Sequence, residues 1–596
     1  MLPLFFRRTE FLVVAILAIA SVVAAWAVPR PVPAAFSVAI PVVWGCLFLY
    51  PPSRLAAWWA WRQVERAAPR VEDRRALGLV LLLAFGLLIW GLDWGLIEHS
   101  WAADELRPDW ARDVLHRGLS SGWCDKYPWM HYAVLAIPVS AFDIADRYAI
   151  LASGSPASWA AQLALMRVVS VLMGLGTLVA AYLCGVELIG ARRAVLGPLA
   201  LLLTPVFVFY GKTANLDVPS LCWFGWALVA FLRIVRINRL PDYVWLGVAA
   251  AGAVATKDQA YANLGLLALA IIIVQARRQA SPKWWGKLRS ALVDSRVLAA
   301  GVAAVLASVV FHNLAFNFGG FVSHIKVLST LGDLAIVPRT AAGYVELTGR
   351  TVALFRWSLG WPLFVMAVAG VASALARKDR RWWLWLLLPP LSFHLTFTWV
   401  TLYVCDRYLF GGDFVLALFA GAACADLIEA VRWRPAARLA VAVSFVYALL
   451  YASSVNVMMN LDARHAARRW ISAHADERTV IALVGRSYMP RLDPPIRATV
   501  VNASLDEVTR VAPDLVVLNA RFAQRFERAS SPEGRELMRA LEDGSLGFAE
   551  AFRYRTPIPA WALLQYEAPF LGSGESGVTN LDKINPEMVI YRRRHP

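Results

Sequence analysis

The sequence predicts a polytopic α-helical membrane protein that carries a soluble α/β domain after its last membrane helix. Two observations lead to this fold class: 59% of the 596 residues are hydrophobic, and only 17% are charged. Soluble domains hold about 45–50% apolar residues. The excess lies in continuous apolar runs of about 17–25 residues without period-two alternation, so it predicts helices and not a transmembrane β-barrel.

Apolar runs at thirteen places are candidate membrane helices. They span residues 11–28, 34–50, 76–97, 159–189, 194–211, 218–235, 243–257, 260–276, 296–316, 352–375, 382–403, 410–430 and 438–457. Lys and Arg cluster in alternate connections, among them residues 54–75, 277–289 and 377–381, and such loops stay on the cytoplasmic side. This bias accounts for the net charge of +17, so we predict no nucleic-acid partner.

The apolar run at residues 129–142 is an exception. It extends over only 14 residues before Asp143, and runs of that length are typically interfacial or re-entrant. If it crossed the membrane, every later basic loop would lie outside. We therefore expect residues 98–158 to form one large outer loop, part of it at the membrane surface.

These boundaries divide the chain into three parts. Residues 1–75 hold an N-terminal helical hairpin and a basic cytoplasmic loop, and residues 76–457 hold the main transmembrane domain. After residue 457 charged residues become frequent, and residues 469–485 and 512–526 show short helix and strand patterns. We expect residues 458–596 to form an α/β domain on the outer face, because thirteen crossings separate it from a cytoplasmic N-terminus.

The large outer loop contains an acidic pair, Asp104 and Glu105. A carboxylate at a bilayer surface, near Trp101 and Trp110, can have a raised pKa and serve as a general base. The alternative is a solvated pair that caps a short helix. In the same loop, Lys-Tyr-Pro at residues 126–128 provides a cation for an anionic ligand, or else an interfacial anchor.

Further polar residues lie at helix ends on the same membrane face by this topology. They are Lys212, Asn215, Asp217, Lys257, Arg407 and Tyr408. Helix capping, a local salt bridge and interfacial anchoring are the simple alternatives for them. His324, in the following outer loop, is more typical of a surface position than of a metal ligand.

Cations and carboxylates thus converge on one rim of the membrane part. Cations there bind a lipid phosphate, and a carboxylate activates a hydroxyl. A transporter or flippase is the alternative, and it predicts charges at mid-membrane and two similar halves. The sequence shows neither feature, which favours an enzyme.

The order of these motifs resembles the GT-C class of integral-membrane glycosyltransferases, and most of all the branch with protein O-mannosyltransferases and bacterial lipid A aminoarabinose transferases. The motifs that carry the resemblance are Asp104-Glu105, the stretch from Lys126 to Tyr132, Asn215-Leu216-Asp217, Thr256-Lys257 and Arg407-Tyr408. The chain departs from the branch in two extra N-terminal helices, in Tyr127 where a proline is usual, and in Asp258 after Lys257.

The resemblance implies a polyprenyl-phosphate sugar as donor, transfer to a hydroxyl with inversion, and a catalytic domain at residues 76–457. It implies Asp104 as general base, Glu105 as a residue that orients it or the acceptor, and Asp217 as a residue that positions the sugar or a lysine. The implied phosphate-binding cations are Lys126, Lys212, Lys257 and Arg407. The implied substrate contacts are Tyr127, His131, Tyr132, Asn215 and Tyr408.

The metal requirement, the membrane location and the acceptor are predicted in more general terms. No metal ligand set is predicted, although a divalent cation between carboxylate and phosphate stays open. We expect an integral protein of a bacterial inner membrane whose active site faces the periplasm. The acceptor is a glycan, lipid or protein hydroxyl, and a polymer-assembling enzyme would differ only in that acceptor. A non-catalytic scaffold would instead leave Asp104→Asn without effect.

Overall fold

The computed structural model describes residues 51–96, 101–117, 122–147, 156–330, 335–429, 434–485, 488–490, 492, 495–520, 532–564 and 578–594. The predicted helices at 11–28 and 34–50 lie outside the described residues. The helices up to residue 460 are α3 (Pro51–Ala67), α4 (Val71–Ile89), α5 (Pro108–Arg117), α6 (Trp129–Arg147), α7 (Pro156–Ile189), α8 (Leu196–Leu202), α9 (Pro205–Tyr210), α10 (Asp217–Arg236), α11 (Leu240–Thr256), η1 (Asp258–Ala260), α12 (Tyr261–Ala276), α13 (Trp284–Leu292), α14 (Ser295–Phe311), α15 (Leu314–Thr330), α16 (Ala341–Ala376), η2 (Lys378–Leu387), α17 (Leu388–Phe393), η3 (His394–Thr398), α18 (Trp399–Thr401), η4 (Asp406–Leu409), α19 (Phe410–Glu429) and α20 (Arg434–Asn460).

Several of these helices make the chain an integral membrane protein. Six segments in the described residues are long and apolar enough to cross a bilayer, or seven if the bent pair α13–α14 counts as one span. The six are residues 159–189, 217–236, 258–276, 341–376, 406–429 and 435–474. Each corresponds to one of the predicted apolar runs, because a span needs about 20 consecutive apolar residues and that requirement is visible in sequence.

Several predicted spans are not continuous helices, and the runs 194–211 and 382–403 are two examples. The run 194–211 divides into α8 and α9, since Pro205 cannot donate the hydrogen bond that would continue α8. The hydroxyl of Thr204 caps α9 by accepting from the backbone N–H of Phe207 at 3.3 Å. The run 382–403 divides into η2, α17, η3 and α18, and it ends at Leu402 with a φ of +52°. Hydropathy detected both apolar runs but not their breaks.

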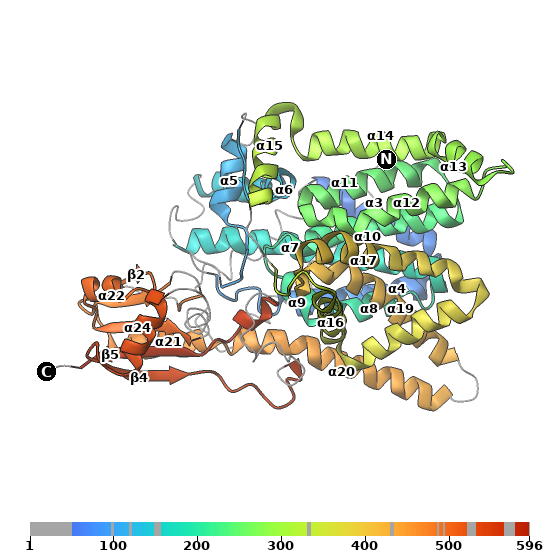
Figure 1. Ribbon diagram of the computed structural model, residues 1–596. Helices are drawn as coiled ribbons and strands as arrows, with labels where there is room; N and C mark the ends of the chain where they lie inside the picture. Colours follow the sequence, from blue (N-terminus) through green and yellow to red (C-terminus); the bar gives the residue numbers. More distant parts are fainter. Residues whose placement is uncertain are drawn as a thin grey trace.

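The bundle is centred on α10 and α19, which are buried along most of their length. In Figure 1, α10 lies among α7, α11 and α12, while α19 packs near α8 and α16. The contact between α8 and α19 needs glycine, because a Cβ on Gly421 would lie 2.5 Å from the backbone nitrogen of Gly197. The close packing of these helices fixes the ends from which the polar residues project.

The outer loop forms a separate small core beside α7. Helices α5 and α6 pack against each other and against α7, with Leu106, Val114 and Leu135 fully or almost fully buried. Helix α6 contains Pro138, and its apolar part, Trp129–Ser140, is shorter than a bilayer crossing requires. The loop therefore holds its own hydrophobic contacts, and these support the segment that precedes α5.

The chain after residue 460 contains a mixed five-stranded sheet in the order β2-β1-β3-β5-β4. Its elements are α21 (Ala463–His474), β1 (Ile481–Val484), β2 (Ala498–Val501), α22 (Leu505–Val511), β3 (Leu515–Asn519), α24 (Pro532–Glu542), β4 (Phe548–Tyr554), η6 (Leu581–Lys583) and β5 (Met588–Arg593). Strand β1 is parallel to β2 and β3, whereas β5 is antiparallel to β3 and β4. Helix α21 covers one face, and α22 and α24 cover the other (Figure 1).

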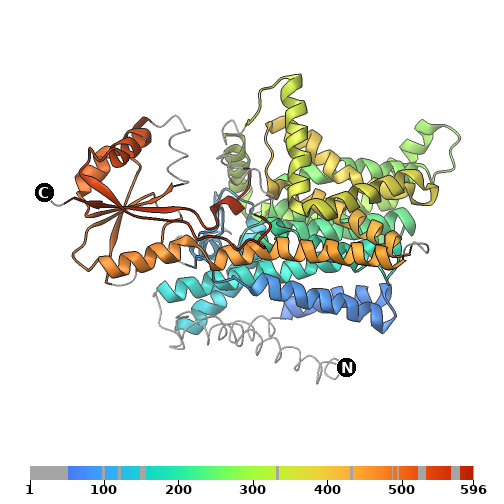
Figure 2. The same cartoon turned by 90° about the horizontal axis from the view of Figure 1, so that it is seen from below.

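Two connections join the sheet to the helical bundle. Helices α20 and α21 lead from the bundle toward the sheet, as Figure 2 shows in orange. The chain then returns before β5, and Leu564, Val578 and Ile584 belong to the hydrophobic core of the bundle. The sheet is thus attached at the end of the bundle where the polar residues described next are found.

Candidate active site

The loop that carries Asp104 is fixed to the turn before α10. The side-chain amide of Asn215 donates to the carbonyl oxygen of Ala103 at 2.9 Å. The backbone N–H of Leu106 donates to the carbonyl oxygen of Ala214 at 3.0 Å. Asp104 itself has a φ of +57°, a left-handed conformation that aspartate tolerates better than most residues. This conformation directs the side chains of Asp104 and its neighbour differently.

Asp104 forms two ion pairs with cations from distant segments. Its Oδ1 accepts from Lys126 Nζ at 2.8 Å, and its Oδ2 accepts from Arg407 Nη1 at 2.6 Å. Burial works to raise the pKa of Asp104, but the charges of Arg407 and Lys126 outweigh it and hold that pKa well below its ordinary value. The carboxylate is therefore ionised across the physiological pH range.

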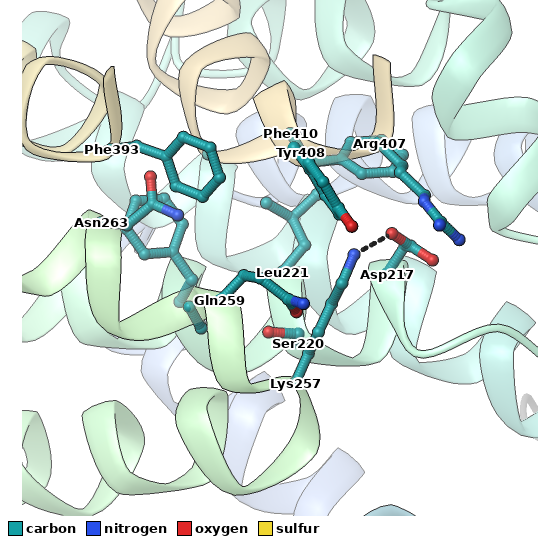
Figure 3. A pocket seen from close by; sticks show the side chains of 13 residues that line it. Asp217, Ser220, Leu221, Lys257, Gln259, Asn263, Phe393, Arg407, Tyr408 and Phe410 are labelled. Atoms are coloured by element: carbon teal, nitrogen blue, oxygen red, sulfur yellow. Dashed lines mark hydrogen bonds and ion pairs between the residues drawn. The ribbon is translucent and has the colours of Figure 1, made fainter. Parts of the chain in front are cut away.

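A second ion pair lies beside the first. Lys257, directly after α11, places Nζ 2.5 Å from Oδ1 of Asp217, the first residue of α10 (Figure 3). Each charge suits its helix end, since carboxylates are favoured at N-termini and cations at C-termini. The ring of Tyr408 links both pairs, with its centroid 4.9 Å from Lys257 Nζ and 5.4 Å from Arg407 Cζ.

Asp217, Lys257, Arg407 and Tyr408 line an open pocket, whose empty space of about 380 Å³ includes bulk solvent at its mouth. Its polar atoms come from Asp217, Ser220, Lys257, Gln259, Asn263, Arg407 and Tyr408. Its apolar wall includes Leu221, Phe224, Phe393 and Phe410. A mostly apolar cavity with a few convergent polar groups is the usual form of a small-molecule site.

Glu105 faces the interior and not the pocket. Its two carboxylate oxygens each accept from Arg167 at 2.7 Å, and Oε1 also accepts from the backbone N–H of Ala214 at 2.7 Å. Arg167 donates further to the carbonyl oxygens of Leu92 and Trp94. Sequence reasoning missed Arg167, although a charge deep inside the apolar run 159–189 indicates a buried partner.

Lys212 also lies away from the pocket. Its Nζ donates to the carbonyl oxygens of Leu87 and Trp90 at 2.7 Å each, and to the side-chain oxygen of Asn456. These bonds satisfy carbonyl groups at the C-terminal end of α4, where a cation also complements the helix dipole. The prediction that Lys212 binds the donor phosphate does not fit this position, because all three of its donors are used.

The predicted substrate-binding residues divide into two groups. Tyr408 lines the pocket, whereas Tyr127 contacts Lys126, with the centroid of its ring 5.1 Å from Lys126 Nζ. Tyr132 instead donates to Asp125 Oδ1 at 2.9 Å within the core of the outer loop. His131 is also buried, and this burial lowers its pKa to about 3, so the imidazole is neutral.

Helix α15 holds the two cation-bearing segments together, which the sequence did not predict. His324 Nδ1 lies 2.8 Å from the carbonyl oxygen of Asp125, and Nε2 lies 3.1 Å from Asp258 Oδ1. Burial opposes a charged imidazolium, but the Asp258 carboxylate and the Asp125 carbonyl oxygen raise the pKa of His324 overall. Asn317 adds a bond to the carbonyl oxygen of Trp123 at 2.6 Å. Helix α15 thereby sets the spacing between Lys126 and Lys257.

No metal ligand set is found among the residues that the structure describes. No three His, Cys, Asp or Glu side chains in those ranges lie together in a way that could hold an ion. Two acidic side chains near the pocket are paired with cations: Asp104 with Lys126 and Arg407, and Asp217 with Lys257. The residues of the site therefore provide positive charges next to carboxylates.

A match to one family of membrane glycosyltransferases supports the resemblance to the GT-C class of integral-membrane glycosyltransferases. The family model that matches, over residues 160–299, is described as Dolichyl-phosphate-mannose-protein mannosyltransferase. This matched region includes Asp217 and Lys257, and it ends before Arg407. No curated protein matches the chain in sequence.

The chain is also similar to several solved structures, each with a TM-score below 0.5. The oligosaccharyltransferase of Archaeoglobus fulgidus has a TM-score of 0.42 at 13% identity, covering 82% of this chain and 74% of its own. ArnT from Cupriavidus metallidurans, bound to undecaprenyl phosphate, has a TM-score of 0.41 at 15% identity, and the match covers 86% of this chain and 97% of ArnT. The mycobacterial arabinofuranosyltransferase AftD has a TM-score of 0.35 at 14% identity, and the match covers 88% of this chain and 42% of AftD.

Proposed function

We propose that this protein transfers a sugar from a polyprenyl-phosphate donor to a hydroxyl group on the outer face of the membrane. The observation that carries the proposal is the meeting of Asp104 with Lys126 and Arg407 beside the Lys257–Asp217 pair. The description of the matching family, a dolichyl-phosphate-mannose-dependent transferase, supports a lipid-phosphate donor. The acceptor is a hydroxyl of a protein, lipid or glycan.

The cations bind the phosphate of the donor and stabilise it as it leaves. Lys257 and Arg407 both line the pocket, and Lys126 is half-exposed at its edge. Preorganised charges in a site that excludes water stabilise a developing negative charge strongly. Asp217 holds the Lys257 ammonium in place through its 2.5 Å contact, and Tyr408 restricts the positions of both pocket cations.

Asp104 acts as the general base in a single displacement. Its low pKa makes it a weak base while both cations are bound to it. The donor phosphate competes for Arg407 and Lys126, so its arrival removes positive charge from the carboxylate and makes it more basic. The acceptor hydroxyl then gives its proton to Asp104 as its oxygen attacks the anomeric carbon. The bond to the phosphate oxygen breaks, polyprenyl phosphate leaves, and the configuration inverts.

The charges at the helix ends support an outward-facing site. Arg233 and Arg236 close α10, and Arg277 and Arg278 follow α12, at the ends of these helices remote from Asp217. Because basic residues stay in the cytoplasm, the opposite ends face outward. We therefore assign the site to the outer face, which is the periplasmic side if the protein resides in a bacterial inner membrane.

A panel of radiolabelled polyprenyl-phosphate sugars tests the donor class. The purified protein should consume at least one donor, and Lys257→Gln should lower kcat/KM roughly ten- to a hundredfold, because a hydrogen bond to a charged group contributes about 1.5–3 kcal/mol. Lys283→Gln, at an exposed position before α13, serves as the matched control. Consumption of no donor, or equal rates for Lys257→Gln and the control, would contradict the proposal.

Cys124 reports on the orientation of the site. It is exposed and lies two residues before Lys126, whereas the other described cysteines are buried. In cells that express a Cys46→Ser background, a membrane-impermeant maleimide should label the protein from outside, and Cys124→Ser should abolish the signal. Labelling that requires permeabilised membranes would place the site in the cytoplasm and overturn the orientation.

A further inference from the structure

The segment at residues 578–585, here called the C-terminal strap, is buried although it belongs to the sheet-bearing part of the chain. Seven of its residues are at most 8% exposed: Val578, Thr579, Asn580, Leu581, Asp582, Ile584 and Asn585. A connection that only joined a sheet to its last strand would normally run over the surface. Figure 2 shows this red segment against the helices of the bundle.

One end of the strap is bonded to the residue before Arg407. The hydroxyl of Thr579 donates to Asp406 Oδ2 at 2.6 Å, and the backbone N–H of Asp406 donates to the carbonyl oxygen of Val578 at 2.9 Å. The other carboxylate oxygen of Asp406 accepts from the backbone N–H of Arg407 at 2.6 Å. A continuous series of bonds thus runs from Thr579 through Asp406 to Arg407, whose guanidinium meets Asp104.

The other end of the strap is bonded to the region that carries Asp104. The backbone N–H of Asn585 donates to Asp462 Oδ2 at 2.9 Å, and the same oxygen accepts from the indole of Trp94 at 3.0 Å. Arg464, which pairs with Asp462, lies 4.0 Å from the ring centroid of Trp101 at the start of the Asp104 loop. The strap therefore contacts the supports of both partners in the Asp104–Arg407 ion pair.

The contact between Thr579 and Asp406 is the one that bears most directly on the position of Arg407. Its side chain is almost fully buried, and burial of a carboxylate is unfavourable unless hydrogen bonds satisfy it. One of these bonds comes from Thr579 and another from the backbone of Arg407. Loss of the Thr579 hydroxyl leaves Oδ2 without that donor and removes one constraint on the short turn η4. Both Arg407 and Tyr408 lie in this turn.

We propose that Thr579 is a positioning residue of the active site, which acts through Asp406 to hold Arg407 against Asp104 and the donor phosphate. The inference rests on the proposed function, and it assigns the strap a part in donor use and not only in folding. Catalytic rates are sensitive to small displacements of groups that bind the reacting centre. The sheet-bearing part then supplies an element that the site requires.

Kinetics of the full-length protein test this role. Thr579→Val and the smaller Thr579→Ala should each lower kcat/KM for the donor about tenfold, since one hydrogen bond to a charged group is lost. Thr579→Ser, which keeps the hydroxyl, should retain near wild-type values. Thr499→Val, at an exposed position on β2, is the matched control and should behave as wild type.

A double variant separates positioning from general stability. With Arg407→Lys already present, Thr579→Val should reduce kcat/KM by less than a further twofold, because residues in one network are not additive. Reductions that simply multiply, or a Thr579→Ser as impaired as Thr579→Val, would overturn the inference. A thermal shift on addition of polyprenyl phosphate provides a readout besides activity, and it should be smaller for Thr579→Val than for Thr499→Val.

The outcomes also separate this inference from the proposed function. If Lys257→Gln reduces transfer but both Thr579→Val and Thr579→Ala match Thr499→Val, the strap has no positioning role and the proposed function stands. If no donor is consumed by the wild type, the proposed function fails first. In that case the thermal shift with polyprenyl phosphate tests the positioning role of the strap by itself. An equal shift for Thr579→Val and Thr499→Val would overturn that role.

Discussion

We expect Asp104→Asn to lower the turnover number of sugar transfer by about 10²- to 10⁴-fold, the usual contribution of general acid–base catalysis. The amide keeps the shape of the side chain but cannot accept the proton of the acceptor hydroxyl. The protein should stay folded, because Lys126 is half-exposed and Arg407 retains its contact with the ring of Tyr408. Initial rates at saturating donor and acceptor measure the effect.

Asp109→Asn is the matched control for this experiment. It removes an exposed carboxylate in α5 whose ion pair, among the described residues, is with Arg107, so transfer should be unchanged. The lowered pKa of Asp104 adds a pH criterion. The free enzyme keeps this carboxylate ionised as the pH falls through the ordinary range of aspartates, so kcat/KM should show no acid limb there. If the Asp104→Asn protein were as active as the Asp109→Asn protein, Asp104 would not be the general base.

Glu105→Gln should destabilise the protein by about 3–5 kcal/mol, the usual consequence of removing one partner from a buried ion pair. The substitution leaves the Arg167 guanidinium charged, buried and opposite a neutral amide. The amide oxygen can still accept from Ala214, so the loss reports on the charge and not on that backbone bond. Thermal unfolding in detergent, followed by intrinsic fluorescence, measures the change.

A second substitution tests whether the charge is the cause. Glu105→Gln combined with Arg167→Gln removes both charges and should recover part of the lost stability, as replacement of whole buried pairs often does. Asp109→Asn should unfold as the wild type does. If Glu105→Gln unfolded normally yet lost transfer, Glu105 would take part in the reaction, as the resemblance first implied, and its structural role would be wrong.

The neighbours Asp104 and Glu105 show where sequence reasoning ended. The acidic pair was visible as a candidate, but the two residue types alone do not show which carboxylate pairs with Arg407 beside the pocket. The φ of +57° at Asp104 turns one side chain toward Arg407 and the next toward Arg167. That conformation depends on the bonds from Asn215 and to Ala214, which are more than 100 residues away in the chain.

Lys212 and Lys257 make the same point for the cations. Both follow apolar helices and both precede another, so their sequence contexts are alike. Their partners differ: Lys212 meets carbonyl groups at the end of α4, while Lys257 meets Asp217 in the pocket. The choice is made by which helices pack nearby, and hydropathy and local spacing contain no information on that packing.

The sequence by itself determined the helical membrane architecture and the grouping of most site residues at one rim. These follow from local rules, because lipid requires unbroken apolar runs and basic loops stay in the cytoplasm. Only the tertiary structure decided the breaks after α8 and within 382–403, the bridge made by His324, and the strap that reaches Asp406. Each of these depends on contacts between segments far apart in the chain, and only folding brings such segments together.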